Sequence, residues 1–132
     1  ERQTTIGLSN ITSACVDTSK GRMFVGTESG SVHVINLSNF ALIKYLDPHQ
    51  KEVSCCTVVE DHNTVITGSW DQYVAIHEVV KNDNPKPSIL KRSKVHRKDV
   101  TCIATSKYFG LVATCSLDCT VCIYDIHLGP LL

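Results

Sequence analysis

Residues 100–126 read VTCIATSKYFGLVATCSLDCTVCIYDI, and two earlier stretches of the chain repeat their pattern. Residues 53–79 read VSCCTVVEDHNTVITGSWDQYVAIHEV, and residues 11–37 read ITSACVDTSKGRMFVGTESGSVHVINL. The three copies are 27 residues long and align without a gap, and each begins with a β-branched aliphatic residue followed by Thr or Ser. Their starts lie 42 and 47 residues apart, which indicates that the chain is built from an internal repeat.

The residues within each copy predict short β-strands. Each copy has three runs rich in Val, Ile, Thr and Cys, separated by turn-forming residues; in the first copy they cover about 11–17, 22–27 and 31–37. A fourth run follows the first two copies, at 41–46 and 88–93. Four short strands in a repeat of about 40–45 residues are typical of one blade of a β-propeller.

We therefore expect an all-β fold with about three four-stranded antiparallel blades of a propeller. The blades would cover residues 11–46, 53–93 and 100–132, the last of them incomplete. Residues 80–87 would form a loop insertion, and residues 2–6 are a candidate for the last strand of a preceding blade. Because three blades do not close a ring, we expect them to be part of a larger ring, with the remaining blades in the same or another chain.

The composition is that of a globular domain without a strong net charge. The 132 residues are 42% hydrophobic and 20% charged, and thirteen Lys and Arg balance thirteen Asp and Glu. A neutral chain is not drawn as a whole to phosphate groups, so no nucleic-acid partner is expected. No apolar run approaches the ~20 residues that a membrane-spanning helix needs.

The seven cysteines are an odd number, which favours free thiols and a cytoplasmic location. Two glycosylation sequons, which begin at Asn10 and Asn36, favour the alternative of a secreted protein. The spacing of Cys115, Cys119 and Cys122 raises the question of a zinc site. For each of these cysteines, however, at least one other copy has Gly or Ala at the equivalent position. We therefore expect the cysteines to be small packing side chains, and we expect neither a metal ion nor a cofactor.

Two histidines and two turns carry a resemblance to a known family. His49 and His96 each stand four residues before a copy, and the turns read GSWDQYV (68–74) and CSLDCTV (115–121). The pattern resembles that of WD repeats, in which a Gly-His element precedes the first strand and a Ser-x-Asp-Gly-Thr turn follows the second. Here Pro48 and Val95 occupy the Gly position, and no copy keeps the Trp of the family's name.

The resemblance implies a buried polar network in each blade, in which the histidine bonds the Asp and the Ser of the turn. The expected members are His49, Asp71, Ser69 and His77 in the second copy, and His96, Asp118, Ser116 and Tyr124 in the third. His77 and Tyr124 would take the place of the family's Trp. The first copy lacks the His and has Ser29 in place of the Asp, so its network is the least certain.

The same residue types occur in hydrolase triads, which leaves an enzyme as a third alternative. A set that recurs in the repeat, without a nucleophile elbow or a glycine-rich phosphate loop, is better explained as structural. No catalytic residues and no enzyme activity are therefore expected.

The resemblance also places a binding surface on one rim, where the residue before each turn Asp points outward. These residues are Glu28, Trp70 and Leu117, and Trp70 is the only tryptophan of the chain. The loops that enter the blades would add the positive charges of Lys51, Arg97 and Lys98. We expect a non-catalytic scaffold that binds a protein or an acidic peptide, with Trp70 as its anchor.

A second hypothesis rests on the basic stretch at 88–98, where Lys91, Arg92 and Lys94 are candidate contacts for an anionic membrane surface. The segment TVITGSWDQYV (64–74) is weakly similar to propellers that follow BEACH domains in trafficking proteins, which would make the chain a docking module of a larger multidomain protein. Charged residues on an outer strand also guard a sheet against edge pairing, so the stretch has a structural explanation too.

Overall fold

The computed structural model describes residues 1, 3, 5, 9–59, 63–79 and 88–126, together with the backbone of residues 129–131. These residues form twelve strands in three separate four-stranded antiparallel sheets, and no helix occurs among them. The described part of the chain therefore also has no helix that could cross a membrane. The loop expected at 80–87 lies outside the described residues, as does most of the candidate strand at 2–6.

Each sheet is a meander whose strands pair in chain order. The first contains β1 (Ile11–Asp17), β2 (Arg22–Thr27), β3 (Val32–Asn36) and β4 (Leu42–Leu46). The second contains β5 (Val53–Val59), β6 (Thr64–Ser69), β7 (Tyr73–Glu78) and β8 (Ile89–Lys94). The third contains β9 (Val100–Ser106), β10 (Leu111–Ser116), β11 (Val121–Asp125) and β12 (Gly129–Leu131). The predicted all-β architecture is confirmed, and the fourth strand of the third sheet is only three residues long.

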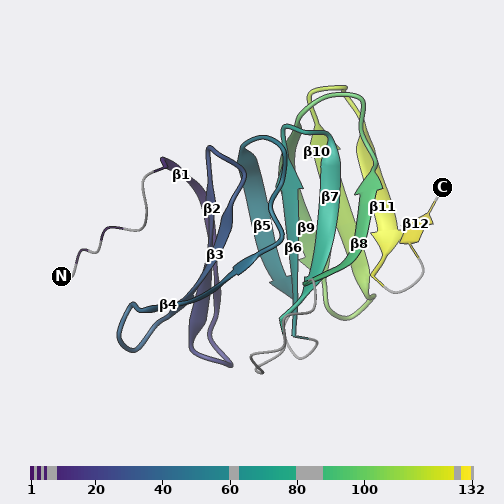
Figure 1. Ribbon diagram of the computed structural model, residues 1–132. Coiled ribbons are helices and arrows are strands. Elements are labelled where there is room, and N and C mark those ends of the chain that lie inside the picture. Colours follow the sequence, from purple (N-terminus) through teal and green to yellow (C-terminus); the bar gives the residue numbers. More distant parts are fainter. Residues whose placement is uncertain are drawn as a thin grey trace.

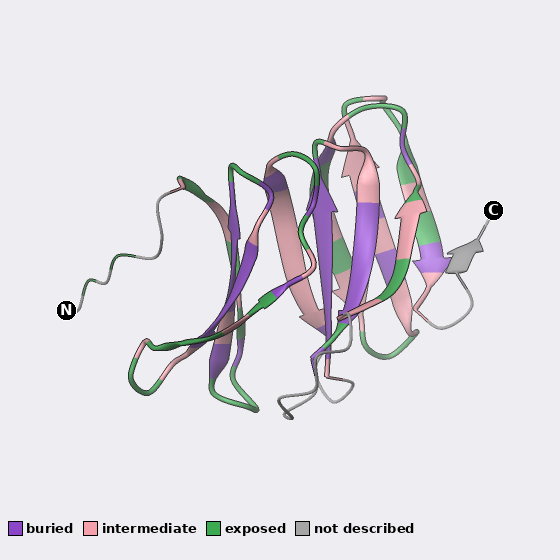
Figure 2. Cartoon of the chain, in the orientation of Figure 1, coloured by how far each residue is buried: buried purple, intermediate pink, exposed green. Residues whose placement is uncertain are grey.

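The three sheets stand side by side in chain order (Figure 1), and each covers a face of the next. One core cluster includes Phe24 of the first sheet and Val65 of the second. Another includes Ile66 of the second sheet and Val112 of the third. Because Val65 and Ile66 are neighbours on β6, they point to opposite faces, and both are fully buried. The middle sheet is thus covered on both sides, as the distribution of buried residues in Figure 2 also shows.

Two glycines let neighbouring sheets approach closely. A Cβ atom on Gly26 would lie 2.6 Å from Cγ1 of Val53, and one on Gly68 would lie 2.7 Å from Cγ1 of Val100. Val53 and Val100 are the first residues of β5 and β9, so the contact repeats at both sheet boundaries. The third sheet has Cys115 at the equivalent position.

Hydroxyl groups tie the sheets together at the same place. Thr12 Oγ1 donates to the carbonyl oxygen of Val53 at 2.6 Å, and Ser54 Oγ donates to the carbonyl oxygen of Val100. In the first two copies, the Thr or Ser at the second position therefore bridges from the innermost strand of its own sheet to the next sheet.

Candidate functional site

A chain of polar side chains runs through the interior of the second sheet. His49 precedes β5, and its Nδ1 lies 2.9 Å from Oδ2 of Asp71 in the β6–β7 turn. Its Nε2 lies 2.8 Å from Oγ1 of Thr67 on β6, which in turn lies 3.0 Å from Nε2 of His77 on β7. The structure thus brings together the expected His49, Asp71 and His77, but through a threonine that the sequence analysis did not name.

Ser69 does not bond His49, in contrast to the arrangement that the family resemblance implied. Its hydroxyl instead donates to the carbonyl oxygen of Lys51 at 3.1 Å and accepts from the N–H of Asp71 at 3.1 Å. Ser116 does the same in the third sheet, with the carbonyl oxygen of Lys98 and the N–H of Asp118. These serines therefore connect the turn to the entering loop by hydrogen bonds, and they do not bond the histidine.

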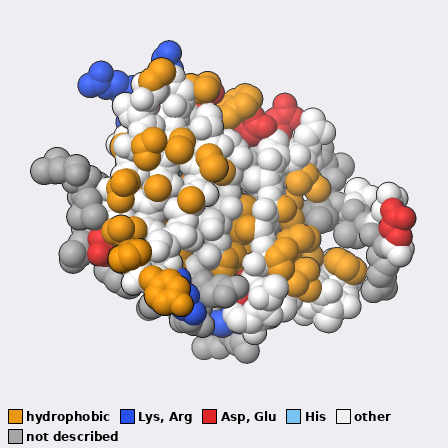
Figure 3. Space-filling model, turned by 180° about the vertical axis from the view of Figure 1, so that it is seen from behind, with side chains coloured by type: hydrophobic (Ala, Val, Ile, Leu, Met, Phe, Trp, Pro, Cys, Tyr) orange, Lys and Arg blue, Asp and Glu red, His pale blue; other side chains and the backbone are white. Residues whose placement is uncertain are grey.

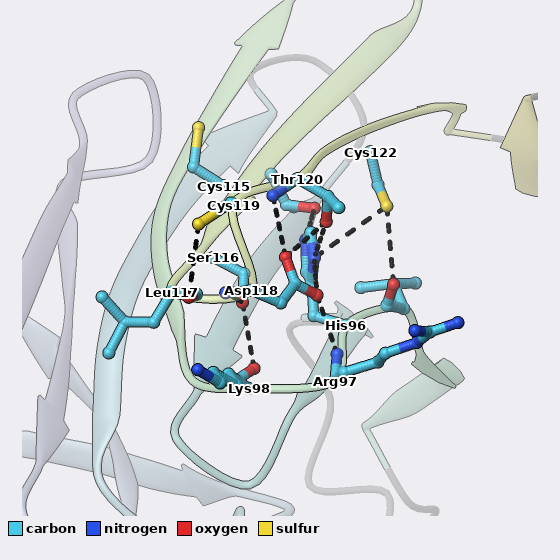
Figure 4. Close-up of polar contacts among 12 residues, drawn as sticks. His96, Arg97, Lys98, Cys115, Ser116, Leu117, Asp118, Cys119, Thr120 and Cys122 are labelled. Atoms are coloured by element: carbon cyan, nitrogen blue, oxygen red, sulfur yellow. Dashed lines mark hydrogen bonds and ion pairs between the residues drawn. The ribbon is translucent and has the colours of Figure 1, made fainter.

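The third sheet repeats the buried set with a tyrosine in place of His77 (Figure 4 shows the part around His96). Nδ1 of His96 lies 3.2 Å from Oδ2 of Asp118 and 3.0 Å from Oγ1 of Thr120. Its Nε2 lies 2.8 Å from Oγ1 of Thr114, which accepts a hydrogen bond from the hydroxyl of Tyr124 at 2.9 Å. Thr114 therefore has the same central position as Thr67.

A signal in the repeat could have found these two threonines. Thr67 and Thr114 occupy the same register, two residues before the serine, and the first copy has Val25 there. The threonine is present in the two copies that have the histidine and absent from the copy that has Ser29 in place of the turn Asp. In the first sheet the hydroxyls of Thr27 and Ser31 lie 2.6 Å apart, and Ser31 contacts Nε2 of His33 at 3.1 Å.

The buried sets shift the acidity of their members. Burial raises the pKa of Asp71, but hydrogen bonds from His49 and from backbone N–H groups outweigh this effect, so the net shift is downward. Hydrogen bonds from Thr120 and from the backbone N–H of Arg97 lower the pKa of Asp118. Burial lowers the pKa of His77 to about 4 and raises that of Tyr124 to about 12. Both aspartates are therefore ionised near neutral pH, and Tyr124 is neutral.

The predicted rim residues lie at equivalent positions, and the backbone N–H of each is hydrogen-bonded to the residues that lead into the first strand of its sheet. The N–H of Glu28 donates to the carbonyl oxygen of Asn10 at 2.8 Å. The N–H groups of Trp70 and Leu117 donate in the same way to Glu52 and Asp99, both at 3.1 Å. Trp70 is 45% exposed and Leu117 is 58% exposed, so these two turns hold large apolar side chains in solvent.

The basic residues fall into two groups with different surroundings. Lys51, Arg97 and Lys98 are exposed in the two loops that lead into β5 and β9, beside the turns of Trp70 and Leu117. The second group consists of Lys91, Arg92 and Lys94 on β8, and its side chains do not point toward one common site. Lys91 and Lys94 are three residues apart on a strand and point to opposite faces, and Arg92 donates to the carbonyl oxygen of Pro48 at 2.6 Å.

The three clustered cysteines point to different surroundings (Figure 4). Cys115 lies near the end of β10, Cys119 in the following turn and Cys122 on β11, where its thiol contacts the carbonyl oxygen of Val95 at 3.4 Å. Within the residues that the structure describes, no group of three or more His, Cys, Asp or Glu side chains converges on one point.

Comparison with curated proteins finds similarity to short parts of much longer chains. Over 92 residues, 63% of this chain, it is 33% identical to the protein SPIRRIG of Arabidopsis thaliana and covers 2% of that protein. Over an equal length it is 32% identical to BEACH domain-containing protein A2 of Arabidopsis thaliana, of which it covers 3%. It is 29% identical over 114 residues, 80% of the chain, to human WD repeat-containing protein 3 and spans 12% of it.

Two crystal structures of computationally designed proteins share the fold. The designed Ika4 protein matches 98% of this chain with a TM-score of 0.82 and 23% sequence identity, and the match covers 75% of Ika4. The designed Ika8 protein matches 92% of the chain with a TM-score of 0.77 and 24% identity, over 35% of its own length.

The sequence profile described as "WD domain, G-beta repeat" matches residues 40–78 and 88–125, which together make up more than half of the chain. Each match begins at or near the outermost strand of one sheet and continues through the inner strands of the next, so that the repeat links neighbouring sheets. Each match also contains one complete His–Thr–Asp set. Repeats of this family generally serve as non-enzymatic scaffolds for protein interactions. The profile match agrees with the three meander sheets and with the histidine that precedes two of them. The chain belongs to the WD-repeat family of β-propeller proteins.

Proposed function

We propose that the chain is a non-catalytic scaffold that binds a protein or an acidic peptide through one rim, with Trp70 and Leu117 as anchors. The observation that carries the proposal is the exposure of these two apolar side chains on turns that are fixed from both sides. The backbone N–H of each anchor bonds the entering loop, and the next residue, an aspartate, bonds the buried histidine. A site that is already rigid loses little conformational entropy on binding.

Positive charge beside the anchors supports an acidic partner. The exposed Lys51, Arg97 and Lys98 belong to the loops that receive the hydrogen bonds from the turns. The carboxylates of Asp71 and Asp118 are directed inward, toward His49 and His96, and do not contact the cationic side chains. An acidic segment that crosses Trp70 and Leu117 would therefore meet apolar contacts between cationic side chains, which favours fast and salt-sensitive association.

The scaffold requires additional blades, and the third sheet offers a face for one. Exposed apolar side chains gather over the C-terminal sheet in the view of Figure 3, and Val121 and Ile123 are 63% and 46% exposed. Thr101 is equivalent to Thr12 and Ser54 and makes their bond within its own sheet, to the carbonyl oxygen of Cys115 at 3.3 Å. We propose that a neighbouring blade of the same or another chain accepts its second hydrogen bond. As a protein with free thiols, the scaffold is expected to work in the cytoplasm.

The binding proposal can be tested by comparing two exposed aromatic residues on opposite rims. Trp70 lies in the β6–β7 turn, whereas Tyr108, 98% exposed, lies in the β9–β10 turn at the other end of the strands. Proteins that co-purify with the unsubstituted protein should no longer do so with the Trp70→Ala variant, but should still do so with the Tyr108→Ala variant. Their binding should weaken as the salt concentration rises. Retention of every partner by a folded Trp70→Ala variant would refute the anchor.

A second candidate function is membrane docking within a larger multidomain protein. The similarity to BEACH domain-containing proteins favours it. The divergent side chains of Lys91 and Lys94 on β8 give it less support than the rim gives the first candidate. Replacement of Lys91, Arg92 and Lys94 by Gln should reduce sedimentation with vesicles that contain anionic lipids if this function is present. An absence of salt-sensitive binding by the parent would remove it.

A further inference from the structure

The polar set of the second sheet extends beyond His77 into a continuous chain of six side chains. Beyond the contacts already described, Nδ1 of His77 lies 3.1 Å from Oγ of Ser88, next to the start of β8. The Ser88 hydroxyl lies 3.1 Å from Oδ2 of Asp47, in the loop that follows β4. The complete order is Asp71, His49, Thr67, His77, Ser88 and Asp47.

The number of hydrogens in this chain can be counted. Its six members are joined by five links, and the carboxylates at its two ends can only accept hydrogen bonds. Two neutral imidazoles and two hydroxyls supply one N–H or O–H each, which is four hydrogens for five links. This series of six side chains therefore lacks one hydrogen, and one of its links can form only if the series binds an additional proton. A buried polar atom that is left without a hydrogen bond is costly.

The third sheet has no such deficit. There the Tyr124 hydroxyl donates to Thr114, Thr114 can donate to Nε2 of His96, and Nδ1–H of His96 can donate to Asp118. The same Nδ1–H can be shared with Oγ1 of Thr120, whose hydroxyl donates to Asp118, so every contact of this set has a hydrogen with a neutral imidazole. The two sheets differ because His77 has a hydrogen-bond partner at each ring nitrogen, Thr67 and Ser88, whereas the hydroxyl of Tyr124 donates to Thr114 and ends the series.

One orientation of the hydrogen bonds satisfies every link when His49 carries the additional proton. His49 then donates from Nδ1 to Asp71 and from Nε2 to Thr67, and Thr67 donates to Nε2 of His77. Nδ1–H of His77 donates to Ser88, whose hydroxyl donates to Asp47. Ser88 also accepts from the backbone N–H of Asp47, and Asp47 accepts from that of Ile89, so each of these two groups has an additional partner.

The charges around the two rings place the proton on His49 rather than on His77. His77 is fully buried, and among the described residues the titratable groups that face it are Asp47, His49 and the cationic Arg92. Asp47 reaches it only through Ser88. His49 contacts the carboxylate of Asp71 directly, and that carboxylate also accepts from the N–H of Gln50 at 3.0 Å. We infer that the second sheet contains a buried proton-binding site, in which His49 is an imidazolium between Asp71 and Thr67 and His77 is a neutral ring protonated at Nδ1.

Loss of this proton would leave one link between the Trp70 turn and the Asp47 loop without a hydrogen. Nitrogen-15 NMR of histidine-labelled protein distinguishes the three forms of an imidazole. At neutral pH we expect both nitrogens of His49 to be protonated, His77 to be the Nδ1–H tautomer, and His96 to be neutral as the internal control. A neutral His49 with the same spectrum as His96 would overturn the inference.

Two substitutions remove the deficit in different ways. Ser88→Ala leaves three links and three hydrogens, so His49 should become neutral and His77 should change to the Nε2–H tautomer. His77→Tyr gives the second sheet the pattern of the third, and His49 should again become neutral. These spectral changes do not follow from a loss of packing alone. An imidazolium at His49 that persists in either folded variant would show that the six-membered chain does not hold the proton.

Discussion

The imidazole Nε2 of His49 lies 2.8 Å from the hydroxyl of Thr67, at a point where both side chains are almost completely buried. This bond joins the loop that enters the second sheet to the strand that leads to the Trp70 turn. The equivalent bond of His96 and Thr114 has the same length in the third sheet. The turn tips that we propose as anchors are thus supported from inside the sheets.

Replacement of Thr67 by Val should destabilise the protein without a change in side-chain shape. His49 and His77 would each lose a buried partner, and the expected loss in the free energy of unfolding is about 1–3 kcal/mol. Denaturant unfolding measures the loss. Thr57→Val, at a half-buried position on the neighbouring strand β5, provides the control and should change stability by less than about 0.5 kcal/mol. Equal effects of the two substitutions would contradict the central position of Thr67.

His96→Ala tests the corresponding set in the third sheet. The substitution leaves Asp118, Thr114 and Thr120 without their shared partner, and we expect a loss of about 1–3 kcal/mol. Thermal or denaturant unfolding reports it. An unchanged unfolding curve would mean that the histidine does not support the turn.

How far the sequence predicts this site is illustrated by Thr67 and Ser69. The repeat of strand-forming runs predicts the sheets, and the resemblance to WD repeats implies that the histidine and the aspartate meet. Thr67 and Ser69, however, are two residues apart on β6 and point to the same side, so alternation cannot decide which of them reaches the ring. The depth of the imidazole decides it, and that depth depends on how the sheets pack.

The bond from His77 to Ser88 could not be predicted from the pattern either. Ser88 follows the long connection after β7, and the pairing of β7 with β8 shifts register between Ile76 and His77. A shift of this kind changes which residues lie opposite each other, and the sequence pattern of the repeat does not predict it. The divergence of Lys91 and Lys94, by contrast, follows from the alternation of side chains once both residues lie on β8.

The turn conformation predicts a stabilising substitution at Cys119. Gly30, Gln72 and Cys119 occupy the same position of the three turns and have φ angles of 94°, 74° and 67°. A side chain in this region costs roughly 1 kcal/mol that glycine does not incur. Cys119→Gly should therefore raise the free energy of unfolding by about 1 kcal/mol, whereas Cys119→Ala, which also removes the thiol, should not. Equal effects of Gly and Ala would show that the thiol, not the backbone, is responsible.

The buried His77 predicts a specific response to acid. Its pKa falls from 6.5 to about 4 in the folded protein, so the unfolded chain binds a proton more readily between these values. The contribution of His77 to stability is complete above pH 6.5 and is lost as the pH falls toward 4. An NMR titration should show a ring that remains neutral through pH 6 and protonates only near pH 4. Titration near pH 6.5 would contradict its burial between Thr67 and Ser88.

The propeller arrangement depends most directly on the packing of one sheet against the next, and a double-mutant cycle on Gly68 and Val100 measures this packing. A methyl group on Gly68 would lie 2.7 Å from Cγ1 of Val100, so Gly68→Ala alone should cost about 1–3 kcal/mol through overpacking. Val100→Ala removes this contact and leaves the contact with Sγ of Cys55, at 2.7 Å within the same sheet, so in this background Gly68→Ala should cost at least about 1 kcal/mol less. Strictly additive losses in the free energy of unfolding would show that these sheets do not pack face to face, and the propeller arrangement on which the proposed scaffold depends would be wrong.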